Sequence, residues 1–120
     1  MAPNLAALRR VSANAERVTV AFLVAGGALD KGKKVTMFLT KEAVRIALPG
    51  YAEAIEAAGA PPVSRLFGQF AEKGGELLVC PICFDARNLD ADALVDNARL
   101  GGAAKLWELI GDEPATVFTY

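Results

Sequence analysis

Short apolar runs recur along the chain between longer stretches whose apolar residues are spaced as on one face of a helix. Residues 35–39 form the clearest run, with the apolar character of a strand that is buried on both faces. Residues 77–79 form a second run, and residues 98–100 and 115–120 are further predicted strands. Strands that alternate with helices predict an α/β fold with a parallel sheet of about five strands and right-handed crossovers.

The predicted helices separate these strands. Apolar residues at helical spacing mark residues 63–73, and a threonine followed by an acidic residue begins a helix over residues 41–48, which a Pro-Gly pair ends. The remaining predicted helices and helical turns are 14–30, 51–58, 91–95, 103–110 and the segment that begins at Pro81. Residues 1–12 fit both a helix face and a short strand, and the two interpretations stay open.

Residues 18–24 are the segment where local propensity and context disagree, because their β-branched side chains favour a strand. Three features favour a helix instead. Asn14 can cap its start, several alanines along it suit close packing on a sheet, and basic residues with a glycine follow at 31–34. We therefore predict a helix over residues 14–30.

The length of the chain, 120 residues, is enough for one domain over residues 1–120 with one sizeable core. Hydrophobic residues make up 53% of the chain and charged residues 22%, which is apolar for a soluble protein. Partner subunits that cover apolar surface explain this excess, so we favour a homo-oligomer. A high alanine content, which adds little apolar area, is the alternative explanation.

The charge balance and the hydropathy exclude some partners. Thirteen Lys and Arg against fourteen Asp and Glu give a formal net charge of −1 without a basic run, so we expect no binding to nucleic acid. The longest apolar run, residues 18–28, is shorter than the roughly 20 residues that span a bilayer. Polar residues follow Arg9 and Arg10, where a leader would be apolar. We therefore expect a cytoplasmic protein whose thiols stay reduced.

Both cysteines of the chain lie in a Cys-Pro-Ile-Cys segment at residues 80–83, between a predicted strand and the helix that the proline begins. The carboxyl ends of parallel strands are where ligands and chemistry collect in such folds. The thiolate is the reactive form of cysteine, and the start of a helix lowers thiol pKa values. Because the chain has no histidine, this helix start is the main expected activator, with Arg87 and Lys41 as candidate cationic neighbours. A buried, inert Cys80 is the alternative.

The order of four segments resembles that of a known family. They are residues 16–22 of the first predicted helix, residues 32–40 around the clearest strand, residues 74–81 around the first cysteine, and residues 100–103 before the closing strand. In this order the chain resembles the DsrE/DsrF-like (YchN-like) family of small sulfur-relay proteins over residues 14–120. The resemblance implies a three-layer, flavodoxin-like α/β domain with a mostly parallel sheet, which assembles as homotrimers or hexamers.

The resemblance also implies a site. Members of the family carry persulfide chemistry on a cysteine just after a central strand, taken here as the fourth strand, and this position matches Cys80. Cys83 has a counterpart in only some members. One departure concerns the start of the chain, because family members usually begin with an apolar strand and a Gly- or Asp-rich loop. Residues 5–12 of this chain contain two arginines instead.

The predicted function is that of a small cytoplasmic sulfur-relay protein, a sulfurtransferase in the broad sense, with Cys80 and Cys83 as its catalytic residues. Cys80 accepts sulfur as a persulfide from a donor protein and passes it to an acceptor, without a cofactor or a metal. One alternative is a non-catalytic oligomeric scaffold or small-ligand-binding module. Another is a dithiol redox protein in which Cys83 closes a disulfide with Cys80. A zinc site would require two subunits to share four ligands.

Other residues are weaker candidates. Glu42 and Asp85 either line a pocket beside the cysteines or are exposed carboxylates near helix starts. Tyr51 is a candidate border of the same site. Trp107 is expected in the core or at an interface, and the glycine pair at 101–102 is expected to serve close packing and turns rather than phosphate binding.

Overall fold

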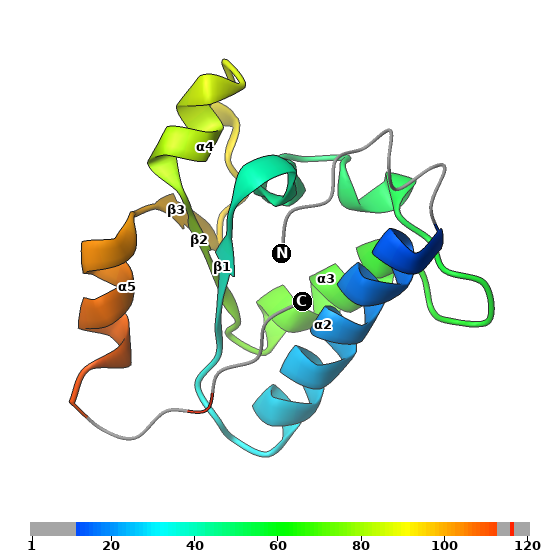
Figure 1. The fold of residues 1–120 in the computed structure, drawn as a ribbon. Coiled ribbons are helices and arrows are strands. Elements are labelled where there is room, and N and C mark those ends of the chain that lie inside the picture. The colour runs from blue at the N-terminus through cyan, green and yellow to red at the C-terminus, as the bar shows by residue number, and fades with distance from the viewer. Residues whose placement is uncertain (1–11, 113–115, 117–120) are drawn as a thin grey trace.

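The computed structural model describes residues 12–112 and residue 116. Its three described strands are β1 (Thr36–Leu39), β2 (Glu76–Val79) and β3 (Ala98–Leu100). They form a parallel sheet in the order β1-β2-β3, so β2 is the central strand (Figure 1). The register pairs Leu39 with Val79 and Val79 with Leu100, which brings the carboxyl ends of all three strands to one edge.

The parallel α/β class is confirmed, but the described residues contain three strands rather than about five. The expected closing strand at 115–120 lies outside the described residues except for residue 116. Residues 1–11, for which the sequence left helix and strand undecided, also lie outside them. The three expected strands at 35–39, 77–79 and 98–100 are found within one residue of their predicted bounds. In the described sheet, Cys80 therefore follows the second strand and not the fourth.

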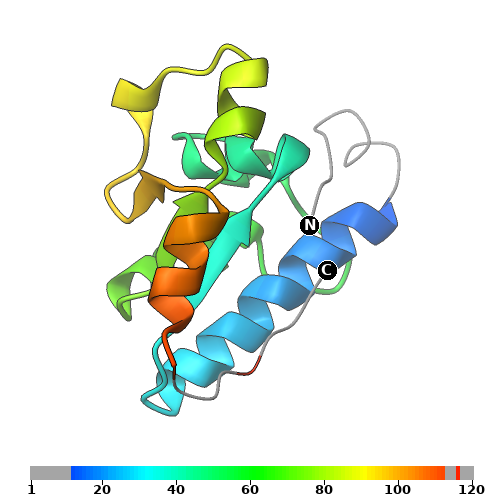
Figure 2. The same ribbon diagram turned by 60° about the vertical axis from the view of Figure 1, so that its left-hand side comes forward.

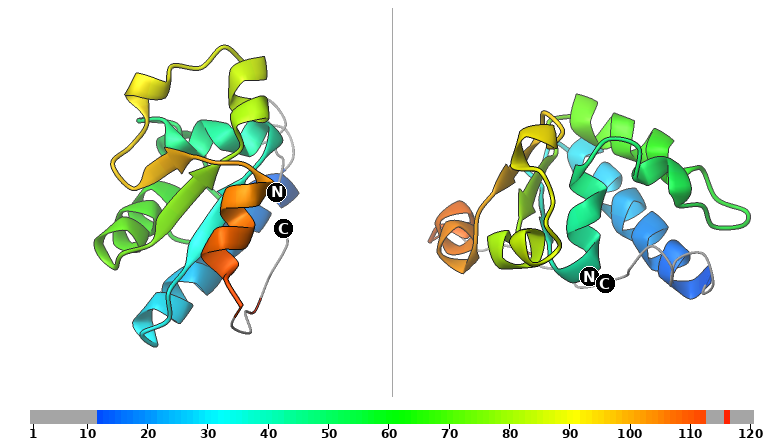
Figure 3. Two further views of the ribbon diagram at one scale, coloured as in Figure 1. Left: turned by 90° about the vertical axis from the view of Figure 1, so that its left-hand side faces the viewer. Right: turned by 90° about the horizontal axis from the view of Figure 1, so that it is seen from above.

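Helices lie on both sides of this sheet. Figure 3 shows α2 (Ser12–Asp30) and α3 (Val63–Glu72) together on one side and α5 (Ala103–Ile110) on the other. The two long helices pack through aromatic rings, with the centroid of Phe22 5.5 Å from that of Phe70 in an edge-to-face arrangement. Both rings are fully buried.

The helix predicted over residues 14–30 is confirmed, although it begins at Ser12, so Asn14 lies inside it and is not its cap. Tertiary packing explains why the strand propensity of residues 18–24 does not prevail. Val18 and Phe22, four residues apart, are both buried on the side that faces the core, whereas Leu23 is 45% exposed. This helical period would be lost in a strand.

The predicted helix over residues 41–48 is wrong in type, because the structure shows a 3₁₀ helix, η1 (Lys41–Ala47). Thr40 occupies its N-cap position, as predicted, and its first turn has the 3₁₀ bond from the Ala43 N–H to the Thr40 carbonyl at 3.1 Å. Leu48 is extended because it precedes Pro49, and this ends the helix.

The other predicted helical turns are shorter than expected. They are the 3₁₀ turns η2 (Ala52–Ala54) and η3 (Ala91–Ala93). Gly101 confirms the packing role of its glycine pair, since a Cβ there would come within 2.6 Å of the buried Leu78 side chain. Trp107 is 68% exposed, so the expectation that it lies in the core of this chain is wrong. The alternative expectation, that it lies at an interface with another subunit, stays a prediction.

Within the described part of the chain, no helix has the length and the apolar character that crossing a membrane requires. The core instead lies between the sheet and the α2–α3 pair. Its largest fully buried side chains are Phe22, Phe70, Phe84, Leu39, Ile46, Ile55 and Leu77.

Candidate active site at the Cys80–Cys83 turn

The two cysteines lie where the central strand ends. Cys80 directly follows β2, and its backbone N–H still bonds to the Leu39 carbonyl of β1 at 3.0 Å. The helix α4 (Pro81–Ala86) then begins with Pro81 in its first turn and Cys80 at its N-cap position. The predicted passage from strand to helix at Cys80 is therefore confirmed.

Opposite faces of α4 differ sharply in burial. Phe84 is fully buried in the core and its N–H bonds to the Cys80 carbonyl at 3.0 Å, whereas Ile82 is 82% exposed. The thiols of Cys80 and Cys83 are free and half-buried. Phe84 thus anchors α4 in the core, while both cysteine residues are partly exposed to solvent.

The segment that faces α4 is η1. Figures 1 and 2 show the two elements beside each other at the carboxyl end of the strands, and they are in contact. Lys41, the first residue of η1, has a φ of 54°, in the left-handed region that few non-glycine residues adopt. Its backbone is the main cause of the lowered pKa of the Cys83 thiol.

This arrangement lowers the pKa of the Cys83 thiol below its ordinary value. The hydrogen bond from the Lys41 backbone is the main cause, and burial opposes it. A hydrogen bond with the Cys80 side chain and the positive charges of Lys41 and Arg87 lower the pKa further. The groups that favour a thiolate therefore lie around Cys83, whereas from the sequence we expected the helix start to lower the pKa of Cys80.

Glu42 links η1 to α4 through two arginines. Its Oε1 accepts from the Arg87 Nε at 2.5 Å and its Oε2 accepts from the Arg45 Nε at 2.8 Å. Arg87 also donates from Nη1 to the Cys83 carbonyl at 3.0 Å, which fixes the guanidinium beside the cysteine turn. Burial raises the pKa of Glu42, but these hydrogen bonds and charges outweigh it and hold that pKa below its ordinary value.

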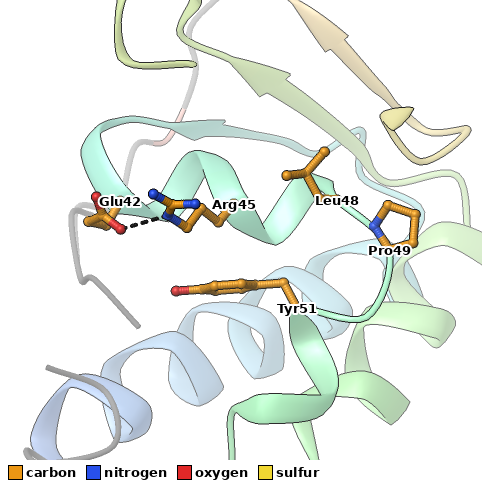
Figure 4. Close-up of a pocket in the computed structure, with 5 residues that line it drawn as sticks. All are labelled: Glu42, Arg45, Leu48, Pro49 and Tyr51. Atoms are coloured by element: carbon orange, nitrogen blue, oxygen red, sulfur yellow. Dashed lines mark hydrogen bonds and ion pairs between the residues drawn. The ribbon is translucent and has the colours of Figure 1, made fainter. Parts of the chain in front are cut away.

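A pocket of about 430 Å³ opens on the other side of Glu42. Figure 4 shows the Glu42–Arg45 ion pair at one end of it and the ring of Tyr51 extending below Arg45. Leu48 and Pro49 complete its lining. Glu42 therefore contributes both to this pocket and to the cysteine turn. Neither cysteine lines the pocket, so it is not the hollow beside Cys80 that the sequence predicted for Glu42 and Tyr51.

Sequence reasoning found most of these residues but not their arrangement. It named Lys41 and Arg87 as candidate cations, and the structure brings both to Cys83. Asp85, the other expected carboxylate, is exposed on α4. Arg45 was missed, although its spacing of three residues from Glu42 within one predicted helix was a usable sign of an ion pair.

Among residues 12–112, no three His, Cys, Asp or Glu side chains gather closely enough to hold a metal ion.

The fold and the site together define a class: a small parallel α/β protein with a thiol pair at the carboxyl end of its central strand. The sequence profile of the DsrE/DsrF-like family matches residues 6–118, so the chain belongs to the DsrE/DsrF-like family. Among solved structures, the chain is similar to the ychN protein from E. coli, with a TM-score of 0.56 and 18% identity over 79% of this chain and 78% of that one. No match was found among curated protein sequences.

Proposed function

We propose that this protein is a persulfide carrier that accepts sulfur on the Cys80–Cys83 pair and passes it to the thiol of an acceptor protein. Membership in the DsrE/DsrF-like family supports a sulfur-relay role. The observation that carries the proposal is the thiol pair itself, free and half-buried at the end of the central strand, with two cations beside it.

The chemistry needs only what the site offers. A thiolate attacks the outer sulfur of a donor persulfide, the donor's sulfur–sulfur bond breaks, and the donor leaves as a thiolate with the bonding electron pair. The carrier then holds the sulfur as its own persulfide, with Cys80 as the resting position, until an acceptor thiolate repeats the same exchange. No external oxidant or reductant takes part.

Mass spectrometry tests this proposal directly. The protein is incubated with a cysteine desulfurase and L-cysteine, and the wild type is compared with the Cys80→Ser, Cys83→Ser and doubly substituted variants. We expect the wild type to gain the mass of one sulfur atom, which a reducing agent removes, and the double variant to gain none. If the wild type and the double variant behave alike with this donor and with thiosulfate, the persulfide proposal is wrong.

The wider setting is proposed on the same grounds: a flavodoxin-like domain that assembles in the cytoplasm as a homotrimer or hexamer and exchanges sulfur with donor and acceptor proteins. Exposed apolar side chains support assembly, since Val20 and Leu23 on α2 and Trp107 on α5 are all more than a third exposed. Light scattering on the purified protein tests the oligomeric state. A monomer at micromolar concentration would contradict it.

A dithiol redox function is the second candidate, because Cys80 and Cys83 are both free and lie three residues apart across the first turn of α4. It predicts a reversible Cys80–Cys83 disulfide with a defined reduction potential and turnover of a disulfide substrate. If neither is observed and sulfur transfer occurs, this candidate is removed. If no sulfur adduct and no disulfide form, a non-catalytic scaffold remains.

A further inference from the structure

We propose that α2 packs antiparallel against α2 of a second copy of this chain, through a face that is exposed in the single chain. This surface, the α2 face, consists of Glu16, Arg17, Val20, Leu23, Val24, Gly27, Asp30 and Lys31, all of which are exposed. The inference rests on the assembly part of the proposed function, and it adds the surface and the symmetry through which two copies meet.

The centre of the α2 face is apolar. Val20, Leu23 and Val24 are 44%, 45% and 37% exposed, and they are three of the six large apolar side chains that are exposed among the described residues. Gly27, one turn further on, is exposed as well. Spacings of three and four residues put all four on one side of the helix. Figures 1 and 2 show α2 at the border of the molecule, so an apolar strip lies open to solvent there.

Charged residues flank this apolar centre at both ends. Glu16 and Arg17 precede it, and Asp30 and Lys31 follow it. The N–H of Lys31 still forms the helical bond to the carbonyl four residues earlier, at 3.3 Å, so the helical period continues to that residue. Within the described residues, Glu16, Arg17 and Lys31 form no ion pair, and Asp30 stays 58% exposed in its pair with Lys73. Each end therefore presents one acidic and one basic side chain to solvent.

An antiparallel pair of α2 helices matches these charges. With a twofold axis between residues 23 and 24, Glu16 lies opposite Lys31 of the partner subunit, and Arg17 lies opposite Asp30 of the partner subunit. The axis makes the interface isologous, so each of these ion pairs occurs twice. A parallel pair would set Glu16 against Glu16 and Arg17 against Arg17, where like charges repel. The charge pattern therefore favours the antiparallel arrangement.

The same register brings the apolar residues together along about 22 Å of helix. Leu23 lies opposite Val24 of the partner subunit at the centre, and Val20 lies opposite Gly27 of the partner subunit on either side. A Cβ on Gly27 would meet nothing within 4 Å, so space for the Val20 side chain is open there. Removal of these apolar groups from water drives the association, and the ion pairs at the ends fix its register.

The symmetry restricts the kind of assembly. A twofold axis joins copies in pairs, so the α2 face fits a dimer or a hexamer built from pairs and does not fit a lone trimer. Neither cysteine belongs to this face, which lies on α2, whereas both cysteines lie at the start of α4. A substitution on the α2 face therefore alters the assembly without removing a thiol.

Cross-linking tests which surfaces meet. In a protein whose own cysteines are replaced by Cys80→Ser and Cys83→Ser, Leu23→Cys places a single thiol beside the proposed axis. We expect mild oxidation to convert this variant to a disulfide-linked dimer, seen on a non-reducing gel. The matched control is Glu108→Cys on α5, which lies on the other side of the sheet and whose side chain is 70% exposed (Figure 3). If both variants form dimers at the same rate, the contact at α2 is refuted.

A charge exchange tests the register. Sedimentation velocity over a concentration series measures the dissociation constant of the assembly. Lys31→Glu should raise this constant at least about threefold, because it sets like charges opposite each other at both ends of the pair. Combining it with Glu16→Lys should restore the wild-type value. The matched combination of Glu16→Lys with Lys34→Glu has the same net charge but leaves position 31 basic, so it should restore nothing. Equal restoration by both combinations would overturn the register.

A third variant separates this inference from the assembly itself. Leu23→Asp should raise the dissociation constant at least about tenfold, because it buries a carboxylate at the centre of the pair. Circular dichroism should show an unchanged fold, since Leu23 is 45% exposed in the single chain. If the wild type assembles and Leu23→Asp assembles equally well, the α2 face is overturned while the homo-oligomer stands. If the wild type is a monomer at micromolar concentration, or a trimer at every concentration, the antiparallel pair is also overturned, and only the monomer contradicts the proposed assembly.

Discussion

Replacement of Phe84 by alanine tests how the cysteine turn is held. Phe84 is fully buried, and it is the only residue of α4 with a buried side chain, whereas both cysteines of the turn are half-buried. Because α4 has only six residues, its own backbone bonds cannot keep it folded, and the anchor must come from packing. Loss of the ring should therefore release the turn as well as open a cavity.

The size of the effect follows from the burial of Phe84. A fully buried phenylalanine costs about 3–5 kcal/mol when it is cut back to alanine, against a total stability of about 5–15 kcal/mol for a domain. With an m-value of about 2 kcal/mol per molar urea, a loss of about 4 kcal/mol lowers the unfolding midpoint by about 2 M. Urea titration followed by circular dichroism measures this shift.

The matched control lies two residues earlier. Ile82→Ala removes an aliphatic side chain from the same helix, but that side chain is 82% exposed, so its change in unfolding free energy should stay within about 0.5 kcal/mol. In Phe84→Ala, alkylation of Cys83 should also move to higher pH, because the turn is no longer held beside η1, whose Lys41 lowers the pKa of that thiol. A loss of less than about 1 kcal/mol in Phe84→Ala would refute the view that this ring anchors the site.

Two further substitutions test the network and the core. Glu42→Gln should cost about 1 kcal/mol at neutral pH, because it removes two charge-assisted bonds at a partly exposed site. Since the pKa of Glu42 is lowered from 4.5, the difference from the wild type should be constant above that pH and shrink as the pH falls through the lowered value, as urea titrations across pH would show. Gly75→Ala should cost about 1–3 kcal/mol of unfolding free energy, because its Cβ would overlap the buried ring of Phe70. The matched control is Gly68→Ala, whose Cβ meets nothing within 4 Å and which should not destabilise the protein. Thermal unfolding of both variants measures the difference.

The fold could be predicted from local sequence wherever the glycine and proline breaks agreed with the spacing of the apolar residues. Apolar runs bounded by glycine and proline gave the three described strands, and helical spacing gave α3 and α5. The helix over residues 18–24 required a choice against propensity, and the buried pair Val18 and Phe22 shows why context prevailed. The 3₁₀ form of η1 had no comparable sign, because a short helix before a proline reads the same in either form.

The candidate site could likewise be predicted only in part. Cys80 and Cys83 were predictable because strand, proline and helix follow one another without a gap in sequence. Their partners were not placed by sequence, since Lys41 reaches Cys83 only through the register that sets Leu39 beside Val79. Glu42 and Arg87 are 45 residues apart, and only the folded sheet makes them an ion pair. Long-range pairing of this kind has no local pattern.

The main cause of the lowered pKa of the Cys83 thiol is a backbone group, and this limits what the sequence can reveal about the chemistry. A side-chain donor would leave a residue type to recognise, whereas the Lys41 amide would be present with any amino acid at position 41. The feature that the structure shows there is a conformation, the positive φ of Lys41 just after the end of β1. The pKa of the Cys83 thiol therefore depends on how η1 and α4 meet across the strand ends, and the Glu42–Arg87 pair joins the two elements at that junction.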